Sequence, residues 1–299
     1  MGTSPFGSLK LLQINLQRSK AAATEAIQVA NSHQADLIAV KEPYCFNKKI
    51  ALFGRFTVFN HINQLKNPLT GIILLNNRLD AQLLLHHTNS YFTTILMKHQ
   101  NTSVVIISFY CPPSVDITNP LEELQSTIQQ LNGLPVLVVG DFNAKSQVWH
   151  SSFEDPRGYK VVELMNSLSL QSLNTSTLPT YSSSTGERWM DISLANCLLT
   201  RQGIYCSTLD EHSASDHSYI VTCIHMSRVV KLLCIRQKTN WAKYQELIKT
   251  HWHIDPVVHI EDTTALELVI DKLQYLILSA YHSATTITTA RQSAPWWTK

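Results

Sequence analysis

The stretch LPVLVVGDFNAKSQVWH, residues 134–150, decides how the rest of the sequence is interpreted. Its first part is a short aliphatic run bounded by proline and glycine, which is typical of a buried β-strand. Asp141 and Asn143 follow this run at once. Because binding and catalytic groups collect at strand ends in layered folds, the stretch predicts a polar site at one edge of a sheet.

The spacing of these polar residues adds a geometric expectation. Asp141 and Asn143 lie two positions apart, so in an extended chain their side chains share one face, and Phe142 points the other way into packing. A turn aspartate explains Asp141 equally well when the stretch is considered by itself. The interpretation as a site therefore depends on similar strand ends elsewhere in the chain.

Length, composition and charge restrict the class of protein. A chain of 299 residues with 44% hydrophobic residues can bury a full core. No apolar run reaches 18 residues and no secretory leader is visible, so we expect a soluble protein that is not secreted and does not enter a membrane. Residues 1–228 hold 16 Lys and Arg against 16 Asp and Glu. A phosphate-bearing partner therefore has to be held locally rather than by a large basic face.

Hydrophobic patterning predicts a mixed α/β domain up to about residue 228. Helices are predicted at 19–33 with Ser19 as N-cap, at 119–131 with Asn119 as cap and Pro120 at the first helical position, and at 158–169. The predicted strands are 9–16, 35–43, 71–77, 91–98, 103–110, 135–141, 189–195 and 218–224. This many strands with few helices favours two packed sheets with helices outside.

The sequence changes in character beyond residue 228. Segments 240–252 and 263–285 carry apolar residues at helical spacing, and the chain stops shortly afterwards at SAPWWTK. We therefore divide the chain into an N-terminal tail (1–8), a main domain (9–228) and a C-terminal helical extension (229–299).

Three further strand ends carry polar residues. QIN closes the first strand with Asn15, and Gln13 lies on the same face. KEP closes the second with Glu42 ahead of Pro43, and SFYCPPS closes the fifth with Tyr110. Each has an ordinary structural explanation. Asn15 can be a turn former, Glu42 an exposed salt-bridge partner and Tyr110 a cap on the core.

The segment EHSASDHSYIV places Ser215, Asp216 and His217 before the last strand. Adjacent strand residues point to opposite faces, so Asp216 and His217 enter one site only where the backbone is irregular. Asp191 lies within the apolar WMDISLANC, where burial of a carboxylate is costly without a partner. A histidine imidazolium is the obvious partner.

Five strand ends thus supply Asn, Glu, Tyr, Asp with Asn, and Asp with His, and chance is the poorer explanation of this convergence. The set suits hydrolysis of a phosphodiester by water. Glu42 offers hard oxygen ligands to Mg²⁺, which offsets charge on the phosphoryl group and on the leaving oxygen. Asp141 can orient or deprotonate the attacking water. Asp191 can hold the His217 ring and favour its charged form.

Six motifs, in this order and at these separations, are similar to those of a known family: LLQINLQRSKAA, KEPY, SFYCPPS, GDFNAKSQVWHS, MDISLAN and SASDHSYI. Residues 9–226 resemble the endonuclease domain of non-LTR retrotransposons. That domain is a member of the endonuclease/exonuclease/phosphatase superfamily and is similar to apurinic endonucleases and deoxyribonuclease I. GDFN together with SDH is highly specific for the superfamily. PWWTK looks like the linker that precedes the reverse transcriptase in such polyproteins, so 229–299 is expected to lead towards a reverse transcriptase domain.

The resemblance implies both a fold and an activity. The fold is a four-layered α/β sandwich like that of deoxyribonuclease I, with two mostly antiparallel sheets flanked by helices. The activity is a Mg²⁺-dependent endonuclease, with Mn²⁺ as a substitute, that nicks one strand of double-stranded chromosomal target DNA. The resulting 3′-hydroxyl primes reverse transcription of the element RNA, which other domains bind. Synthesis in the cytoplasm and action in the nucleus follow from this role, and the oligomeric state is left open.

Residue roles follow from the same resemblance. The implied metal ligands are Glu42, Asn15 and Asp216, and the implied catalytic residues are Asp141, Asn143, Tyr110, Asp191 and His217. Asp141 would align the attacking water, and Asn143 and His217 would contact the scissile phosphate. Tyr110 would act at the same site, and Asp191 would orient the histidine.

DNA contacts are expected from loops around the site. In relatives the segment before the orienting aspartate forms a hairpin that enters a DNA groove, and YSSSTGERW takes that place here, with Arg188 as its clearest contact. A solvated loop has the same composition, which is the alternative. Lys145 and His150 after GDFN are further candidates, with Trp149 packing their loop, and Ser215 beside SDH completes the predicted set.

Two other functions stay open from the sequence alone. One is a sister enzyme, either an apurinic-site nuclease or a phosphatase acting on inositol phosphates or sphingolipid. QIN, YCPPS and the PWW tail favour the retroelement enzyme. The other is a decayed copy that only binds nucleic acid or protein. No substitution interrupts the implied site, which favours an active enzyme.

Overall fold

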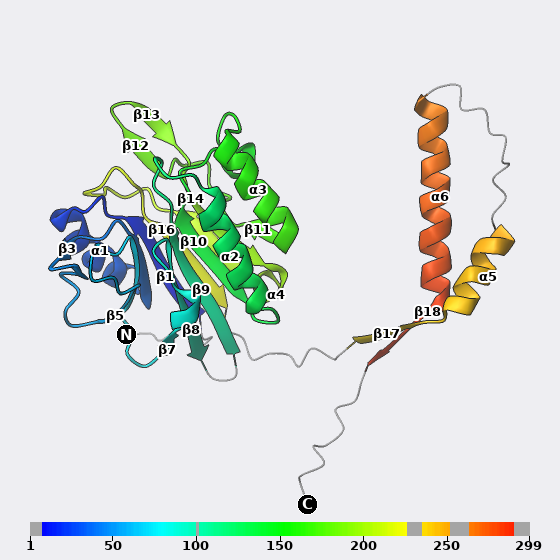
Figure 1. Ribbon diagram of the computed structural model, residues 1–299, viewed down its shortest axis with the longest axis horizontal. Coiled ribbons are helices and arrows are strands. Elements are labelled where there is room, and N and C mark those ends of the chain that lie inside the picture. Colours follow the sequence, from blue (N-terminus) through cyan, green and yellow to red (C-terminus); the bar gives the residue numbers. More distant parts are fainter. Residues whose placement is uncertain (1–7, 100–101, 226–234, 252–262, 290–299) are drawn as a thin grey trace, which may run out of the picture. The chain divides into compact units, whose positions relative to one another are not determined.

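The computed structural model describes residues 8–99, 102–225, 235–251 and 263–289. Contacts divide the chain into two compact units, Met1–Arg228 and Val229–Lys299. The described part of the first unit contains two large β-sheets and the helices that cover them (Figure 1). The described residues of the second unit form two helices and a small pair of strands.

The first large sheet has six strands in the order β15-β16-β1-β2-β6-β5. β1 and β2 run parallel, and all other neighbours run antiparallel. The strands are β1 (Ser8–Asn15), β2 (Leu37–Lys41), β5 (Thr57–Phe59), β6 (Thr70–Leu74), β15 (Ile204–Thr208) and β16 (Ile220–His225).

The second large sheet has the order β11-β14-β10-β9-β8-β7. β9 and β10 run parallel, and the other pairs run antiparallel. The two sheets therefore share one plan, a central parallel pair flanked by antiparallel strands. The strands are β7 (Asp80–Leu83), β8 (Phe92–His99), β9 (Thr102–Tyr110), β10 (Val136–Asp141), β11 (Leu170–Ser172) and β14 (Asp191–Asn196).

Helices cover the outer faces of both sheets. α1 (Lys20–Ser32) packs its buried alanines on the first sheet, and α2 (Thr118–Gln130) and α3 (Pro156–Leu168) pack together on the second (Figure 1). A third core cluster fills the space between the sheets. The layers are helix, sheet, sheet and helices, so the predicted four-layered α/β sandwich with mostly antiparallel sheets is confirmed.

The strand pattern produces these layers directly. In β1, Leu9 and Leu11 join the cluster between the sheets together with Leu137 of β10, whereas Leu12 and Ile14 join the cluster beneath α1. Alternate residues of a strand point to opposite faces, and both faces are covered here, so β1 carries apolar residues on both faces. Truncation of a side chain in this core, such as Leu137→Ala, costs roughly 2–5 kcal/mol.

The helix starts agree only in part with the prediction. Ser19 caps α1 through its hydroxyl, as predicted. The predicted cap of α2 is wrong, because the helix begins at Thr118 and both Asn119 and Pro120 lie inside its first turn. Asp116 instead accepts hydrogen bonds from the N–H and the hydroxyl of Thr118. Asp116 and Asn119 are both cap-forming residue types, and the sequence does not decide between them.

Several short elements carry too little periodicity to be predicted. The edge strands β5, β7, β11 and β15 belong to this group. The others are β3 (Cys45–Phe46), β4 (Lys49–Ile50), β12 (Tyr181–Ser183), β13 (Gly186–Arg188), α4 (Cys197–Thr200) and the single turns η1 (Leu85–His87) and η2 (Gln147–Trp149).

The second unit contains the two predicted helices and a strand pair that was not predicted. The helices are α5 (Trp241–His251) and α6 (Thr263–Ala284). β17 (Ile235–Thr239) pairs antiparallel with β18 (Thr285–Thr289), so the extension is not wholly helical. The β-branched run TTITT favours a strand, but it directly follows a helical pattern. The closing PWWTK lies outside the described residues.

None of the described helices is both long enough and apolar enough to cross a lipid bilayer.

Candidate active site

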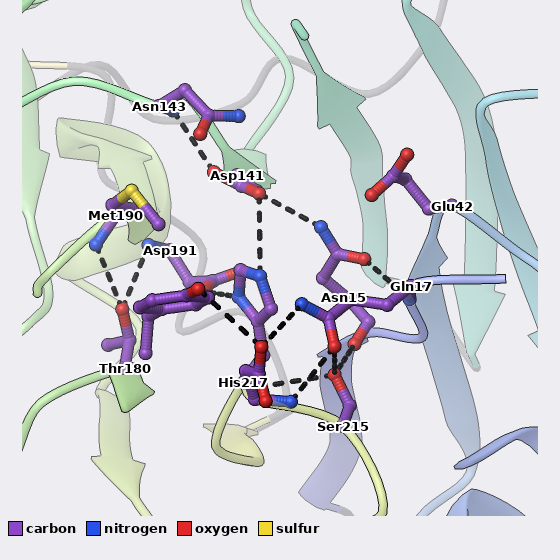
Figure 2. A network of polar contacts seen from close by, with 12 residues as sticks. Asn15, Gln17, Glu42, Asp141, Asn143, Thr180, Met190, Asp191, Ser215 and His217 are labelled. Atoms are coloured by element: carbon purple, nitrogen blue, oxygen red, sulfur yellow. Dashed lines mark hydrogen bonds and ion pairs between the residues drawn. The ribbon is translucent and has the colours of Figure 1, made fainter. Parts of the chain in front are cut away.

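The polar strand ends of both large sheets meet at one edge of the sandwich. β10 lies between β9 and β14, and its register places Asp141 beside Tyr110 on one side and Asp191 on the other. In the other sheet, β1 ends at Asn15. Asn15 Nδ2 donates to Asp141 Oδ2 at 2.9 Å and so connects the two sheets (Figure 2). Residues 126 positions apart in sequence therefore form one site.

Gly140 allows Asp141 to reach this position. A Cβ at Gly140 would lie 2.6 Å from the carbonyl oxygen of Phe109 and 2.9 Å from its Cβ, so only glycine fits beside β9. Phe142 is buried and stacks on Phe109 with 4.4 Å between ring centroids, in agreement with its predicted packing role. The GDF sequence thus anchors the strand end as well as supplying the carboxylate.

Asn143 differs from the predicted extended geometry. β10 ends at Asp141, and Asn143 has φ +47°, a left-handed conformation that asparagine tolerates. Its N–H donates to Asp141 Oδ1 at 3.0 Å, and its Nδ2 donates to the carbonyl of Cys111 at 3.2 Å. Asn143 therefore lies directly beside Asp141 (Figure 2), but through a turn and not through a shared strand face.

Arg157 holds the loop after β10 in place, and nothing in the sequence pattern singles it out. Three hydrogen bonds from one planar guanidinium fix the positions of their acceptors. α3 begins at Pro156, two residues before the predicted start, because Asp155 caps it. The acceptors of Arg157 are the carbonyl oxygens of Cys111, Val115 and Phe142.

His217 lies between two buried carboxylates. Its Nδ1 is 2.7 Å from Asp191 Oδ2, and its Nε2 is 4.0 Å from Asp141 Oδ2. The structure thus brings Asp191 and His217 together. Ligand atoms of the three residues all lie within 4.8 Å of one another, so this buried group could hold a metal ion.

The electrostatics of this buried group adjust both titrating residues. Burial raises the pKa of Asp141 to about 6, and the charge of Asp191 acts in the same direction, against the charge of His217 and the hydrogen bonds from Asn15 and Asn143. Burial alone would lower the pKa of His217, but the charge and the hydrogen bond of Asp191 outweigh it and raise that pKa. A carboxyl group whose pKa lies near neutrality, as that of Asp141 does, is suited to acid–base catalysis.

The space between the sheets becomes polar towards this edge. On the inner face of β1, Leu9 and Leu11 are followed by Gln13 and Asn15, all of them buried. Gln13 accepts a hydrogen bond of 3.3 Å from the Ser193 hydroxyl of β14. This polar layer lies directly beneath the buried carboxylates and separates them from the aliphatic core.

Lys41 belongs to the same layer and was not predicted. It ends β2 beside Asn15, its side chain is fully buried, and its Nζ has no hydrogen-bond partner among the described residues. Burial lowers the pKa of Lys41 to about 7, while the charges of Asp191 and Asp141 oppose that shift. The sequence LIAVK shows a lysine at an inward position of a buried strand. Because lysines are rarely buried, this position could have indicated Lys41 as a site residue.

Glu42 forms the other side of the site. Glu42 was predicted to lie within a strand, but β2 ends at Lys41. The φ of Glu42 is +42°, a left-handed conformation that costs roughly 1–2 kcal/mol. Its carboxylate is 18% exposed and pairs with Arg18 Nη2 at 2.8 Å. Figure 2 shows this carboxylate on the far side of Asn15 from His217.

Asp216 and His217 lie in the loop before β16, and their side chains do not enter the same buried group. His217 is buried, whereas Asp216 is exposed and accepts hydrogen bonds from Gln17 Nε2 at 3.2 Å and from the Tyr181 hydroxyl at 3.5 Å. The predicted metal ligand Asp216 therefore lies outside the buried group that contains His217.

Ser215 fastens this loop to the end of β1. Its hydroxyl donates to the carbonyl of Asn15 at 2.7 Å and accepts from the N–H of His217 at 3.2 Å. Gln17 adds a second link, because its Oε1 accepts from the N–H of Asp216 at 3.0 Å. Ser215, which was predicted to contact DNA, thus helps to hold the loop that carries His217.

The hairpin predicted before Asp191 is present as β12 and β13. Arg188 lies over the ring of Tyr181, 5.5 Å from its centroid, and Tyr181 meets His217 edge-on at 5.0 Å. At the base of the hairpin, the Thr180 hydroxyl accepts a hydrogen bond from the N–H of Asp191. The hairpin is therefore joined directly to the buried group.

The loop after GDFN has internal partners. Lys145 Nζ lies 4.7 Å from the ring centroid of Phe153, and His150 Nε2 is 3.0 Å from the carbonyl oxygen of Asn174. Trp149 is fully buried, as predicted. Lys145 and His150 would have to leave these contacts, at least in part, to reach DNA.

A known protein family matches the part of the chain that carries most of this site. The family described as endonuclease-reverse transcriptase matches residues 104–221. The resemblance drawn from the sequence is thereby confirmed. The matched segment runs from β9 to the start of β16 and contains Asp141, Asp191 and His217.

Two solved structures share the fold. One is the endonuclease domain of TRAS1, a telomere-specific non-LTR retrotransposon, with a TM-score of 0.66 and 23% identity, covering 74% of this chain and 100% of that one. The other is the AP endonuclease LMAP from Leishmania major, with a TM-score of 0.58 and 10% identity, covering 73% and 88%. No curated protein sequence matches the chain.

Proposed function

We propose that the chain is an endonuclease that hydrolyses a phosphodiester bond in one strand of double-stranded DNA and leaves a 3′-hydroxyl. The observation that carries this proposal is the buried group of Asp141, Asp191 and His217, joined to the other sheet through Asn15. It lies in the segment that matches the endonuclease-reverse transcriptase family.

The chain's own residues supply the acid–base chemistry. Asp141, with a pKa of about 6, is ionised at neutral pH and basic enough to accept a proton from an attacking water. Asp191 fixes the ring of His217 through Nδ1, so that Nε2 faces the site and can donate to a phosphate oxygen in the charged form. Asn143 and Tyr110 flank Asp141 and complete the polar surface.

The donor set fits a hard divalent cation. Glu42 offers carboxylate oxygens and Asn15 an amide oxygen, which are the ligand types that Mg²⁺ or Mn²⁺ prefers. When bound, the cation supplies positive charge that offsets the charge developing on the phosphate and the leaving oxygen. Glu42 and Asn15 are its proposed principal ligands, with Asp216 at the solvent side of the set. Arg18 now occupies one Glu42 oxygen and would exchange it for the ion.

The proposed role is target-strand nicking for a non-LTR retrotransposon. The nick would prime reverse transcription on chromosomal DNA in the nucleus, with the element RNA held by domains outside this chain. The family name endonuclease-reverse transcriptase and the likeness to the TRAS1 endonuclease domain support this role. The hairpin with Arg188, and Lys145 once released from Phe153, are its proposed DNA contacts.

A substrate comparison tests the proposal. The full chain is incubated with Mg²⁺ and with a supercoiled plasmid, a duplex containing one abasic site, or a phosphoinositide. We expect nicked plasmid, loss of nicking when the cation is chelated, and no preference for the abasic site. A strong preference for the abasic duplex or the lipid would assign the chain to a sister enzyme instead, and no cleavage of any substrate would reject the proposal.

A further inference from the structure

A pocket opens at the Glu42 side of the site, away from the base of the β12–β13 hairpin. Its volume is about 430 Å³, within the range of ligand-binding pockets. Arg18 and Glu42 line one wall, residues from the segment 61–69 line another, and Tyr91, directly before β8 of the second sheet, also lines the pocket. The pocket is therefore continuous with the proposed metal side of the site.

The chemistry of this lining suits a nucleotide. Among the lining residues, Arg18, His61 and Lys66 carry or can carry positive charge, and Glu42 is the one carboxylate and is already paired with Arg18. Cations hold phosphate oxygens, and an aromatic ring such as Tyr91 can stack on a base.

The segment beside the pocket is a turn that hydrogen bonds fix in place, and aliphatic side chains lie at its surface. Asn63 Oδ1 accepts hydrogen bonds from the N–H groups of Leu65 at 2.8 Å and Lys66 at 3.2 Å, and Lys48 Nζ donates to the carbonyl of Gln64 at 2.6 Å. The turn therefore has a defined conformation. It places Lys66 on the pocket and the neighbouring Leu65 towards solvent.

The exposure of this turn is unusual within the first unit. Leu65 is 84% and Ile62 is 77% exposed, the highest values among the large hydrophobic side chains described there. Burial of apolar side chains is favourable, so a partner surface that covers the pair would be bound more tightly. Apolar side chains flanked by cations are the combination with which proteins wedge into the minor groove while holding phosphates.

We propose that residues 61–67 and the adjoining pocket form a second DNA-contacting element, opposite the hairpin. Ile62 and Leu65 pack against the minor groove, and Lys66 holds a phosphate of the strand that flanks the scissile bond. This inference rests on the proposed function. Duplex DNA is favoured over a protein as the occupant because the pocket is cationic and opens onto the proposed catalytic residues.

The experiment measures binding and cutting separately. Ile62→Ser/Leu65→Ser and Lys66→Ala are made in the full chain, and affinity for a labelled duplex is measured with Asp141→Asn added so that the DNA stays intact. We expect the double variant to bind the duplex about tenfold more weakly, which corresponds to about 1.4 kcal/mol of binding free energy. Lys66→Ala should reduce the slope of log affinity against log salt by about one. Nick positions on a plasmid should also be redistributed.

Matched controls lie at the opposite edge of the sandwich. β14 runs from Asp191 at the site to Asn196, and Arg201 follows at that far end, where exposed Tyr205 begins β15 with Ile204. Tyr205→Ser and Arg201→Ala should leave affinity, salt slope and nick positions unchanged. Unchanged thermal midpoints would show that the exposed substitutions leave the fold intact.

The outcomes separate this inference from the function on which it rests. Normal binding and cutting by the turn variants, while Asp141→Asn abolishes cutting, would overturn the inference and leave the proposed function standing. A change in self-association with unchanged DNA binding would also overturn it, because the turn would then be a protein contact. Failure of the unmodified chain to cut DNA would instead reject the proposed function.

Discussion

The two sides of the site are built in different ways. On the His217 side, Asp141, Asp191 and His217 are buried and joined by short contacts. On the Glu42 side, a partly exposed carboxylate in a strained backbone conformation pairs with exposed Arg18 and faces an open pocket. Groups fixed in advance need no reorganisation during a reaction, whereas an open side can admit ligands. We infer that the first side performs proton chemistry and the second receives the cation and the DNA strand.

The largest effect is expected on the buried side. Asp141→Asn removes the proposed base but keeps its shape, so DNA nicking should fall by about 10³–10⁴-fold. Rates of plasmid nicking at saturating Mg²⁺ measure this. Asp80→Asn, an exposed position at the start of β7, is the matched control and should nick normally. Near-normal nicking by Asp141→Asn would remove the buried side from the chemistry.

A smaller and different loss is expected on the open side. Glu42→Gln should reduce nicking by roughly 10²–10³-fold at low Mg²⁺, and higher cation concentrations should recover part of it, because the substitution weakens an ion site without altering the proposed base. Titration of the rate with Mg²⁺ distinguishes the two sides. Glu163→Gln on the exposed face of α3 should leave the titration unchanged. A loss that no cation concentration relieves would contradict the assignment of Glu42.

Asp191→Asn tests how His217 is positioned. The Asp191 charge raises the pKa of His217, so its removal should lower that pKa and reduce nicking by about 10–100-fold. NMR titration of the imidazole measures the pKa directly and does not depend on activity. An unchanged pKa would show that the 2.7 Å contact does not tune the histidine.

The smallest effect concerns stability. A pKa raised from 3.8 to about 6 means that native Asp141 keeps its proton between roughly pH 4 and 6, where the unfolded chain loses it. Asp141 therefore destabilises the fold progressively over that window and fully above it, by at most about 3 kcal/mol. Asp141→Asn should raise the thermal midpoint by several degrees at pH 7.5 and by much less at pH 4. Equal midpoints for Asp141→Asn and the unmodified chain at pH 7.5 would show that burial of the ionised carboxylate does not destabilise the fold.

The strand ends were predictable because each carries a local signal. A buried strand shows as an aliphatic run, and a polar residue directly after it stands out, as Asn15 and Asp141 do. The geometry within the loops was not predictable, since Asn143 adopts a left-handed turn that an extended pattern does not show. The cap of α2 failed for a related reason, because Asp116 and Asn119 offer equivalent side chains.

The residues that hold the site together escaped prediction because their partners are distant in sequence. Arg157 bonds carbonyls from other loops, and Thr180 caps the backbone at Asp191 across a hairpin. Lys41 has an ordinary strand neighbourhood, and its importance follows from burial beside carboxylates of the other sheet. Tertiary proximity, not local pattern, defines these roles.

The chemistry of the cut ends shows whether the chain hydrolyses the bond to leave a 3′-hydroxyl. Supercoiled plasmid is treated with the chain and Mg²⁺, and the nicks are then offered to a DNA polymerase, with and without prior removal of 3′-phosphate. We expect open circles whose nicks are extended at once, and almost no nicks from Asp141→Asn. Nicks that need phosphate removal before extension, or equal nicking by both proteins, would contradict the proposed function.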